Sequence, residues 1–312
     1  MTTPSIFITS ATGCLGTSLA CQLLSLNWSI HTTTRDPSSP AAIALSSLGV
    51  HIHQASWDST KTLLNIFKQC THLFLNLMPD FTNENNELVW GKSILSLAQS
   101  TGTIKHVVYS SGLPLPNHPD LVYTFFTPKM CQAKSEIEKM IPEFGFDSWT
   151  ILQPGFFMAN FLLPKVDFLF PGASTSGIFS LAYSPEDNLG LVDPEDIARF
   201  AVKAFLKPEK FHARKIRLAG EKLSVEECLR KLAEVSGKDI KGRYLTEEEV
   251  DKEVKEKGNA LLVVQRMNKG MDELVDLEEV KGWGVEMGGF EGFLRREREV
   301  VEESYGRVGR EI

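Results

Sequence analysis

Residues 5–16, Ser5-Ile-Phe-Ile-Thr-Ser-Ala-Thr-Gly13-Cys14-Leu-Gly16, combine a short apolar run with a turn punctuated by glycine. The run predicts a buried first strand, and the helix after the turn is expected to begin near Cys14. Small residues in such a turn let backbone N–H groups approach a pyrophosphate, and the N-terminus of the new helix adds partial positive charge. The stretch therefore predicts a dinucleotide site at the start of an α/β fold.

The match to the usual dinucleotide fingerprint is imperfect, because Ser10 occupies the position that is normally the first glycine. A glycine pattern alone is weak evidence. The next expected strand, residues 29–34, ends at Arg35, about twenty residues after the turn, where the adenosine ribose is recognised. Arg35 suits a 2′-phosphate and favours NADP, whereas Asp36 suits an unphosphorylated ribose and makes NAD the less favoured cofactor. A solvated loop charge is the alternative for Arg35.

The composition limits the class of protein. The chain has 312 residues, 42% of them hydrophobic, and a formal net charge of −7. It can bury a core, and its mixed charges argue against nucleic acid or an anionic membrane as partner. No apolar run reaches the roughly 18 residues of a membrane-spanning helix, and no signal peptide is recognised, so we expect a cytoplasmic protein. The five cysteines form no ligand-like cluster, and no metal is expected.

Strand-length apolar runs alternate with helix-length segments through the first half of the chain. This alternation predicts a Rossmann-type, doubly wound parallel sheet, in which ligands bind beyond the carboxyl ends of the strands. The expected strands are residues 5–9, 29–34, 50–53, 72–77, 106–110 and 149–152. The expected helices are residues 15–26, 41–48, 60–68, 85–100 and 129–144.

The alternation loosens after residue 153, where the chain becomes rich in Phe, Pro and Gly. We expect residues 1–153 to form the NAD(P)-binding Rossmann domain and residues 154–312 a smaller α/β lobe that binds substrate. Within this lobe, Asp193–Ile197 is expected to start a helix. Residues 224–235 open with the spacing of a capping box, and residues 246–257 predict a solvated helical face.

Three polar residues beyond the turn are candidates for chemistry. Ser110 and Ser111 follow an expected strand and place hydroxyls at the ligand edge of the sheet, although a polar strand end is the alternative. Lys134 lies on an apolar helical stripe with Ile137 and Ile141, so we expect it to face inward. A partly buried ammonium needs partners, which a cofactor hydroxyl or a substrate oxygen would supply. The alternative is a lysine that extends from the helix edge into water.

These residues together resemble the NmrA-like family of atypical short-chain dehydrogenases, which includes isoflavone- and phenylcoumaran-type reductases and redox-sensing regulators. The resemblance covers nearly the whole chain, and the order of its motifs is specific. The motifs are Ala11–Gly16, Thr34–Asp36, Val107–Gly112, Lys134–Glu138, Pro154–Asn160 and Asp193–Ile197.

The resemblance implies a cofactor site along the sheet edge, with the pyrophosphate on the first turn, the adenosine at Arg35 and the nicotinamide beside Lys134. In the reductase branch, the lysine that matches Lys134 is the acid/base group. The implied cofactor-binding residues are Ser10, Ala11, Thr12, Gly13, Cys14, Leu15, Gly16, Arg35, Asp36, Pro37, Ser38, Ser39, Trp57, Asp58, Asn76, Leu77, Met78, Lys134, Pro154, Gly155, Phe156 and Phe157.

One departure from ordinary short-chain dehydrogenases concerns their Tyr-x-x-x-Lys motif. The residue four positions before Lys134 is Met130, which cannot transfer a proton. Tyr123 precedes Lys134 by eleven positions, so we expect it to pack or to contact substrate. The tyrosine mechanism is therefore not expected.

Phenylalanines are concentrated in two segments expected to flank the nicotinamide. Aromatic walls with few polar anchors suit an apolar, aromatic substrate, and core packing is the alternative for most of these rings. The residues are Phe125, Phe126, Phe156, Phe157, Phe161, Phe168, Phe170 and Phe179. Residues 174–188 are expected to form either a mobile lid over the pocket or an ordinary surface loop.

The sequence predicts an NADP-dependent oxidoreductase that transfers a hydride between the nicotinamide and an apolar, aromatic carbonyl or enone metabolite. Lys134 is the expected acid/base group, and Ser110 or Ser111 orients the substrate. A place in specialised metabolism follows by analogy with the family. The alternative is a non-catalytic NADP-binding redox sensor that acts through a protein partner.

Overall fold

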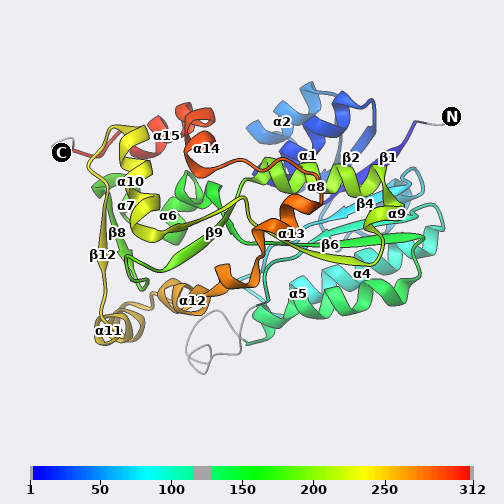
Figure 1. Cartoon of the computed structure of the whole chain (residues 1–312). Helices are drawn as coiled ribbons and strands as arrows, with labels where there is room; N and C mark the ends of the chain where they lie inside the picture. The colour runs from blue at the N-terminus through cyan, green and yellow to red at the C-terminus, as the bar shows by residue number, and fades with distance from the viewer. Residues whose placement is uncertain (1–2, 115–127, 310–312) are drawn as a thin grey trace. The chain divides into compact units, whose positions relative to one another are not determined.

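The computed structural model describes residues 3–114 and 128–309 (Figure 1). The chain forms two compact units. Among the described residues, the first unit comprises residues 3–114, 129–153 and 197–216, and the second comprises residues 128, 154–196 and 217–309. Residues 197–216 lie after the expected domain boundary at residue 153 but belong to the first unit.

The first unit is built on a seven-stranded sheet with the order β10-β6-β5-β4-β1-β2-β3. Strands β1 to β6 pair with their neighbours in parallel; for example, Phe7 of β1 lies opposite His31 of β2 and Leu73 of β4. This confirms the expected doubly wound parallel sheet. The strands are β1 (Ser5–Ile8), β2 (Ser29–Thr34), β3 (His51–Gln54), β4 (His72–Leu75), β5 (His106–Ser110), β6 (Ser148–Pro154) and β10 (Arg214–Leu218).

Helices lie on both faces of this sheet, and Figure 1 shows α1 and α2 above it and α4 and α5 below it. In α3, Leu63, Ile66 and Phe67 recur at helical spacing and are buried in one cluster with Phe7 of the sheet. The helices are α1 (Cys14–Ser25), α2 (Pro40–Ser47), α3 (Thr60–Phe67), α4 (Asn86–Thr101), α5 (Pro128–Met140), the 3₁₀ turn η2 (Ile141–Phe144), α8 (Pro194–Leu206) and α9 (Pro208–Phe211).

Most expected elements of the first unit differ from the observed ones by one or two residues. The helix expected over residues 129–144 ends earlier, at Met140, and continues as the 3₁₀ turn η2. Pro142 explains this end, because proline lacks the N–H that an α-helix would need there. Strand β10 was not expected from the sequence.

The second unit contains two small sheets, one with the order β11-β9-β7 and one formed by β8 and β12. Its strands are β7 (Phe156–Phe157), β8 (Ile178–Leu181), β9 (Asn188–Val192), β11 (Glu221–Ser224) and β12 (Lys241–Tyr244). Its helices are η3 (Met158–Phe161), α6 (Lys165–Leu169), α7 (Ala173–Ser176), α10 (Val225–Ser236), α11 (Glu247–Lys257), α12 (Leu261–Asn268), η4 (Met271–Leu274), α13 (Leu277–Gly282), α14 (Phe290–Arg296) and α15 (Arg298–Tyr305).

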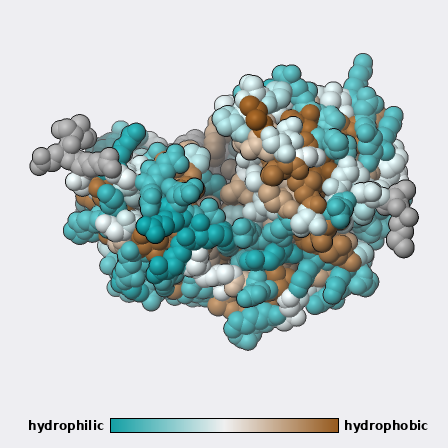
Figure 2. All heavy atoms as spheres, turned by 90° about the horizontal axis from the view of Figure 1, so that it is seen from above, coloured by the Kyte–Doolittle hydropathy of each residue, from teal (hydrophilic) through white to brown (hydrophobic). Residues whose placement is uncertain are grey.

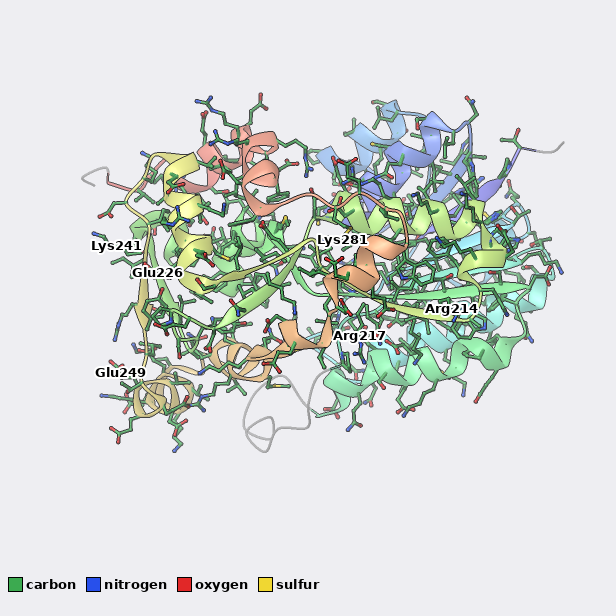
Figure 3. The ribbon with its side chains drawn as sticks, viewed as in Figure 1. Arg214, Arg217, Glu226, Lys241, Glu249 and Lys281 are labelled. Carbon is green, nitrogen blue, oxygen red and sulfur yellow. The ribbon has the colours of Figure 1, made fainter. Side chains whose placement is uncertain are left out.

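The capping box expected at the start of α10 is present. Ser224 Oγ accepts a hydrogen bond from the Glu227 backbone at 3.1 Å, and the Glu227 carboxylate accepts one from the Ser224 backbone at 2.9 Å. The same reciprocal pair joins Thr246 and Glu249 at the start of α11, where Figure 3 labels Glu249. Local sequence therefore determines where both helices begin.

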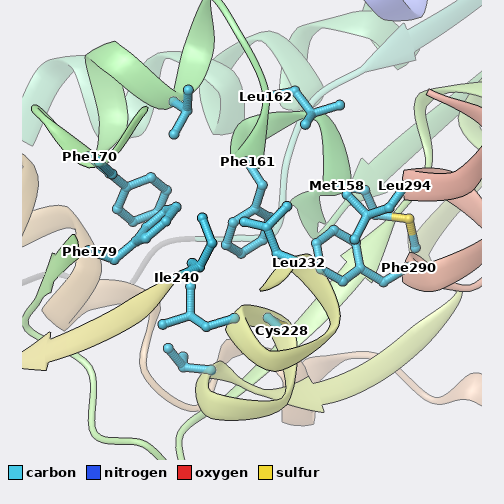
Figure 4. Close-up of a cluster of buried hydrophobic side chains, with 14 of the residues drawn as sticks. Met158, Phe161, Leu162, Phe170, Phe179, Cys228, Leu232, Ile240, Phe290 and Leu294 are labelled. Atoms are coloured by element: carbon cyan, nitrogen blue, oxygen red, sulfur yellow. The ribbon is translucent and has the colours of Figure 1, made fainter. Parts of the chain in front are cut away.

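Three of the eight phenylalanines expected around a substrate pocket instead form part of the core of the second unit. Phe161, Phe170 and Phe179 are buried in one cluster with Phe290, and the ring centroids of Phe170 and Phe179 lie 5.1 Å apart (Figure 4). Phe168 is 46% exposed. The residues Tyr123, Phe125 and Phe126 lie outside the described part of the chain. The pocket interpretation is therefore wrong for Phe161, Phe170 and Phe179.

The expected lid over residues 174–188 is also wrong. This segment contains the end of α7 and all of β8, whose residues pair with β12. Phe179, Leu181 and Tyr183 are buried. Gly177 ends α7 with a positive φ of 76°, so this glycine marks a helix end.

Three further observations concern the described residues. Figure 2 shows hydrophobic side chains gathered over the first unit on the viewed face, and Ile43 in α2 is 53% exposed. Among residues 3–114 and 128–309, no helix is both long and apolar enough to cross a membrane. The same residues contain no group of three or more His, Cys, Asp or Glu side chains arranged to hold a metal ion.

Candidate cofactor and catalytic site

The turn after β1 has the backbone geometry of a dinucleotide fingerprint, although its first glycine is replaced. Ser10 has a φ of 51°, in the left-handed region that glycine normally occupies. Its hydroxyl donates a hydrogen bond of 2.9 Å to the carbonyl oxygen of Asn76, just after β4. The serine thus keeps the turn and ties it to the neighbouring strand end.

The two remaining glycines of the turn have different roles. A Cβ at Gly16 would lie 2.5 Å from Ala11 Cα, so only glycine lets α1 pack this closely on the turn. A Cβ at Gly13 would meet only Ser10 O, at 3.4 Å, so nothing in the described protein requires a glycine there. Gly13 is also the N-cap of α1, which has no side-chain cap. These features fit a pyrophosphate that approaches Gly13 and the first turn of α1.

The segment after β2 separates the roles of Arg35 and Asp36. Asp36 Oδ1 accepts hydrogen bonds from the Ser38 backbone at 2.9 Å and the Ser38 hydroxyl at 2.5 Å. These bonds hold the pKa of Asp36 below its usual value. Arg35 is exposed, and Pro37 contributes to a pocket of about 360 Å³ that α2 and β3 complete. One oxygen of Asp36 is thus engaged locally and the other is not, and a contact of Arg35 or Asp36 with the adenosine end of a cofactor stays a prediction.

The residues expected around the adenine lie beside a tryptophan that sequence reasoning missed. Asp58 Oδ1 accepts a hydrogen bond of 3.1 Å from Nε1 of Trp90 in α4. Trp57 is partly buried against the core cluster of the first unit. The structure therefore fixes Asp58 against α4, and its contact with a cofactor stays a prediction.

Asn76, Leu77 and Met78 follow β4 at the edge of the sheet, and their side chains differ in burial. The backbone N–H of Asn76 donates to Thr9 Oγ1 at 2.6 Å, which fixes this strand end beside the first turn. The Leu77 side chain is 1% exposed and belongs to the core, whereas Met78 is 62% exposed. Of these three residues, Asn76 and Met78 have side chains outside the core.

Lys134 faces inward, as expected from the apolar stripe. Its Nζ donates to Glu87 Oε1 at 2.6 Å and to the Leu77 carbonyl at 2.9 Å, and its side chain is 28% exposed. A Cβ at Gly112, just after β5, would lie 3.8 Å from Lys134 Cδ. Lys134 therefore lies at the carboxyl ends of β4 and β5. An ammonium has three donors, so one remains without a partner among the described residues.

Sequence reasoning missed Glu87, which is 1% exposed. Glu87 is the second residue of α4, and an acidic residue in a first helical turn is ordinarily explained by the helix dipole alone. Its partner Lys134 is 47 positions away in the sequence. The sequence signal for Glu87 was a carboxylate directly before the apolar residues of a helix. This signal does not indicate which residue pairs with the carboxylate.

Ser111 belongs to a second polar network. Its hydroxyl donates to Glu138 Oε1 at 2.6 Å, while Gln153 and Lys215 donate to the same carboxylate at 2.9 and 2.8 Å. The network joins α5 to β6 and β10. Ser110 is buried at the end of β5. This contact gives Ser111 a structural role, and a catalytic role for either serine stays a prediction.

The expected nicotinamide-side residues Pro154–Phe157 belong to the second unit. The Gly155 N–H donates to the Leu218 carbonyl at 2.8 Å, and a Cβ at Gly155 would collide with Gly190 O. Phe156 and Phe157 form β7, and Nζ of Lys165 lies 4.9 Å from the centroid of the Phe157 ring. Their contact with a cofactor stays a prediction.

The profile of the NmrA-like family matches residues 2–295. The chain belongs to this family, and the resemblance seen in the sequence is confirmed. It is 26% identical over 257 residues to the "NmrA-like family domain-containing oxidoreductase malD" of Malbranchea aurantiaca, covering 77% of this chain and 74% of that protein. It is 24% identical over 249 residues to the "NmrA-like family domain-containing oxidoreductase ptmS" of Penicillium ochrochloron, covering 75% of this chain and 73% of that protein.

Solved structures share the fold over nearly the whole chain. The negative transcriptional regulator NmrA in complex with NAD has a TM-score of 0.74 and 16% identity, with 98% of each chain covered. NmrA in complex with NADP gives a TM-score of 0.69 at 18% identity, also covering 98% of each chain. An NADPH-dependent quinone oxidoreductase from Escherichia coli gives 0.69 at 20% identity, covering 94% of this chain and 99% of that one.

Proposed function

We propose that the protein is an NADP-dependent oxidoreductase that transfers a hydride between the nicotinamide and an apolar, aromatic carbonyl or enone compound. The observation that carries this proposal is the position of Lys134, which lies at the carboxyl ends of β4 and β5 with one N–H donor remaining. The names of the curated relatives malD and ptmS, both called oxidoreductases, support it.

The cofactor would be held mainly by the first unit. Gly13 and the first turn of α1 would bind the pyrophosphate, and Arg35 would bind the 2′-phosphate that distinguishes NADP from NAD. Solved relatives in complex with NADP and with NAD support both cofactors, and Arg35 favours NADP. When bound, the cofactor supplies or accepts the hydride.

Lys134 performs the proton step in this proposal. Reduction of a carbonyl places a hydride on carbon and a proton on oxygen, and Lys134 Nζ donates that proton. In the reverse direction, the amine accepts it. Replacement of the usual tyrosine by Met130 leaves Lys134 as the candidate for this role, and general acid/base groups typically contribute at least a hundredfold to the rate.

The test measures turnover and cofactor binding of the same variants. Aromatic ketones, aromatic enones and quinones are screened by NADPH oxidation, and Lys134→Ala and Lys134→Met are compared with the wild type. We expect turnover to fall about a hundredfold or more while NADPH affinity, read by nicotinamide fluorescence, stays within about tenfold. Full turnover in both variants would remove Lys134 from this role.

A control is needed because Lys134→Met leaves the buried Glu87 without its partner, which is destabilising. The double variant Lys134→Met/Glu87→Gln removes both charges and serves as the folded reference. Loss of turnover in this variant, with NADPH binding retained, supports the proton step.

The second candidate is an NADP sensor that acts through a protein partner without catalysis. Two observations favour it: the absent tyrosine and the fold shared with NmrA, which is described as a negative transcriptional regulator. A sensor would bind its partner with an affinity that depends on NADP or NADPH. Turnover of any compound of the screen that depends on Lys134 would exclude this reading.

A further inference from the structure

We infer that Glu87 is a positioning residue that fixes the Nζ atom of Lys134 at the ligand edge of the sheet. The inference rests on the proposed role of Lys134. Glu87 Oε1 lies 2.6 Å from Nζ, and the side chain of Glu87 is 2% exposed. Together with the Leu77 carbonyl at 2.9 Å, it uses two donors of the ammonium and leaves the third for a ligand.

The packing of α4 on α5 makes this contact possible. Gly91 follows Glu87 by one helical turn, and Ile137 follows Lys134 by nearly one turn. A Cβ at Gly91 would lie 2.6 Å from Ile137 Cδ1, so the absent side chain allows a close approach of the two helices. The ion pair and the Gly91–Ile137 contact are therefore consecutive contacts along one helix–helix interface.

The loop between β4 and α4 is itself held by hydrogen bonds of Asp80. Asp80 Oδ2 accepts a hydrogen bond of 2.7 Å from the side chain of Asn86, the first residue of α4. Asp80 Oδ1 accepts from the backbone and the hydroxyl of Thr82 at 2.8 and 2.6 Å. These bonds fold the chain between Leu77 and Glu87, which are the two groups that hold Lys134.

Stability alone does not explain Glu87. Its Oε2 atom is buried without a hydrogen-bond partner among the described residues. In contrast, the buried Glu138 accepts hydrogen bonds at both oxygens. A half-satisfied buried carboxylate costs free energy, and buried ion pairs are often no more stabilising than apolar side chains. The cost is understandable if the carboxylate holds a reacting group in place.

The consequence for catalysis is geometric. A lysine side chain has four rotatable bonds, so without a fixed partner its ammonium group would occupy many positions. A displacement of about 1 Å at a reacting group can reduce a rate about a hundredfold. Glu87 therefore acts through Lys134 on turnover, and not on the binding of the cofactor at the first turn.

The experiment uses the full chain with Glu87→Gln, which keeps the shape of the side chain and removes its charge. We expect turnover of phenanthrenequinone, an aromatic dicarbonyl probe, to fall about ten- to a hundredfold, while NADPH affinity stays within about threefold. In the Lys134→Met background, Glu87→Gln should cause no further loss of turnover. Glu136→Gln, on the exposed pair of α5 with Lys139, is the matched control and should be silent.

A second readout does not depend on any substrate. With isotopically labelled lysine, the NMR signal of the Lys134 ammonium protons, assigned by Lys134→Met, should be protected from solvent exchange in the wild type. It should be lost in Glu87→Gln. A protected signal in Glu87→Gln would overturn the inference.

The outcomes separate the two proposals. If Lys134→Met keeps full turnover, the proposed proton step is wrong, and the NMR readout still decides whether Glu87 holds Lys134. If Lys134→Met loses turnover and Glu87→Gln keeps it, the positioning role is wrong and the proposed function stands. If Glu87→Gln does not fold, Glu87→Asp retains the charge but retracts it by one methylene. Wild-type turnover in Glu87→Asp would contradict positioning, and reduced turnover with retained NADPH binding would support it.

Discussion

The hydroxyl of Ser10 donates a hydrogen bond of 2.9 Å to the carbonyl oxygen of Asn76, so the first turn of the sheet is tied to the end of β4. Ser10 also has a positive φ of 51°, which costs about 1 kcal/mol for a residue with a side chain. The hydrogen bond offsets this cost by a comparable amount, about 1 kcal/mol. A serine can therefore replace the usual glycine without loss of the turn.

Replacement of Ser10 tests this balance. Ser10→Ala removes the hydrogen bond but keeps the strained φ, and we expect it to lower the free energy of unfolding by about 1 kcal/mol. Ser10→Gly removes both terms and should be nearly neutral. Urea unfolding of the two variants measures the difference. Equal losses in both would show that the backbone strain at Ser10 is negligible.

Arg35 should determine the preference for NADPH. Arg35→Ala removes a charged donor at the end of β2, so we expect NADPH to bind about ten- to a hundredfold more weakly, while NADH affinity changes by less than about threefold. Nicotinamide fluorescence titration measures both. Arg230→Ala, which removes an exposed arginine paired with Glu234, is the control and should change neither. Equal weakening of NADPH and NADH by Arg35→Ala would contradict the assignment.

Cofactor binding should protect Cys14 from a maleimide reagent. Cys14 is exposed in the glycine turn, and Cys21 is exposed further along the same helix. We expect NADPH to slow labelling of Cys14 and to leave Cys21 unchanged, because only Cys14 lies where the pyrophosphate would bind. Mass spectrometry reads each thiol separately. Burial raises the pKa of Cys70 to about 12, so that thiol should stay unlabelled in the folded protein. Labelling of Cys14 at the same rate with and without NADPH would contradict this site.

The sequence predicted those features that local patterns determine. Strands β1 to β6, the glycine turn and the capping box of Ser224 with Glu227 all depend on residues close together in the chain. The inward direction of Lys134 followed from the spacing of Ile137 and Ile141 on one helical stripe. These features can be predicted without knowing which helices and strands pack against each other.

The features that the sequence missed depend on contacts between distant residues. Glu87 is adjacent to Lys134 only because α4 packs on α5, and a first-turn glutamate has a sufficient local explanation. Phenylalanines such as Phe161 and Phe179 have the same composition whether they line a pocket or fill a core, so only packing distinguishes the two. The composition of residues 174–188 fits a lid or a surface loop as well as the end of a helix, because glycine at a helix end and glycine in a loop look alike in a sequence.

Ser111 should contribute to stability through Glu138. Its hydroxyl is a donor to this buried carboxylate at 2.6 Å, and Ser111→Ala removes that donor. We expect the free energy of unfolding to fall by about 1 to 3 kcal/mol, with NADPH affinity unchanged. Ser110→Ala, at the preceding residue, is the comparison for turnover. Wild-type stability with lost turnover in Ser111→Ala would contradict this stabilising role and support the predicted catalytic role of this serine.

Stability should fall on acidification because of two histidines in the sheet. Burial and the neighbouring His51 and His53 lower the pKa of His31 to about 4, and burial and His106 lower the pKa of His72 to about 4. The unfolded chain, with histidine pKa values near 6.5, therefore binds more protons than the folded chain between pH 6.5 and 4. The stabilisation is fully present above about pH 6.5 and is lost as the pH falls toward 4.

Thermal unfolding between pH 6.5 and 4 measures this loss of stability, and His31→Gln should reduce the slope of Tm against pH. Asp80 does not contribute here, because Thr82 and Asn86 lower its pKa to about 2, below this window. A Tm that is constant from pH 6.5 to 4 would contradict the burial of these imidazoles as neutral groups.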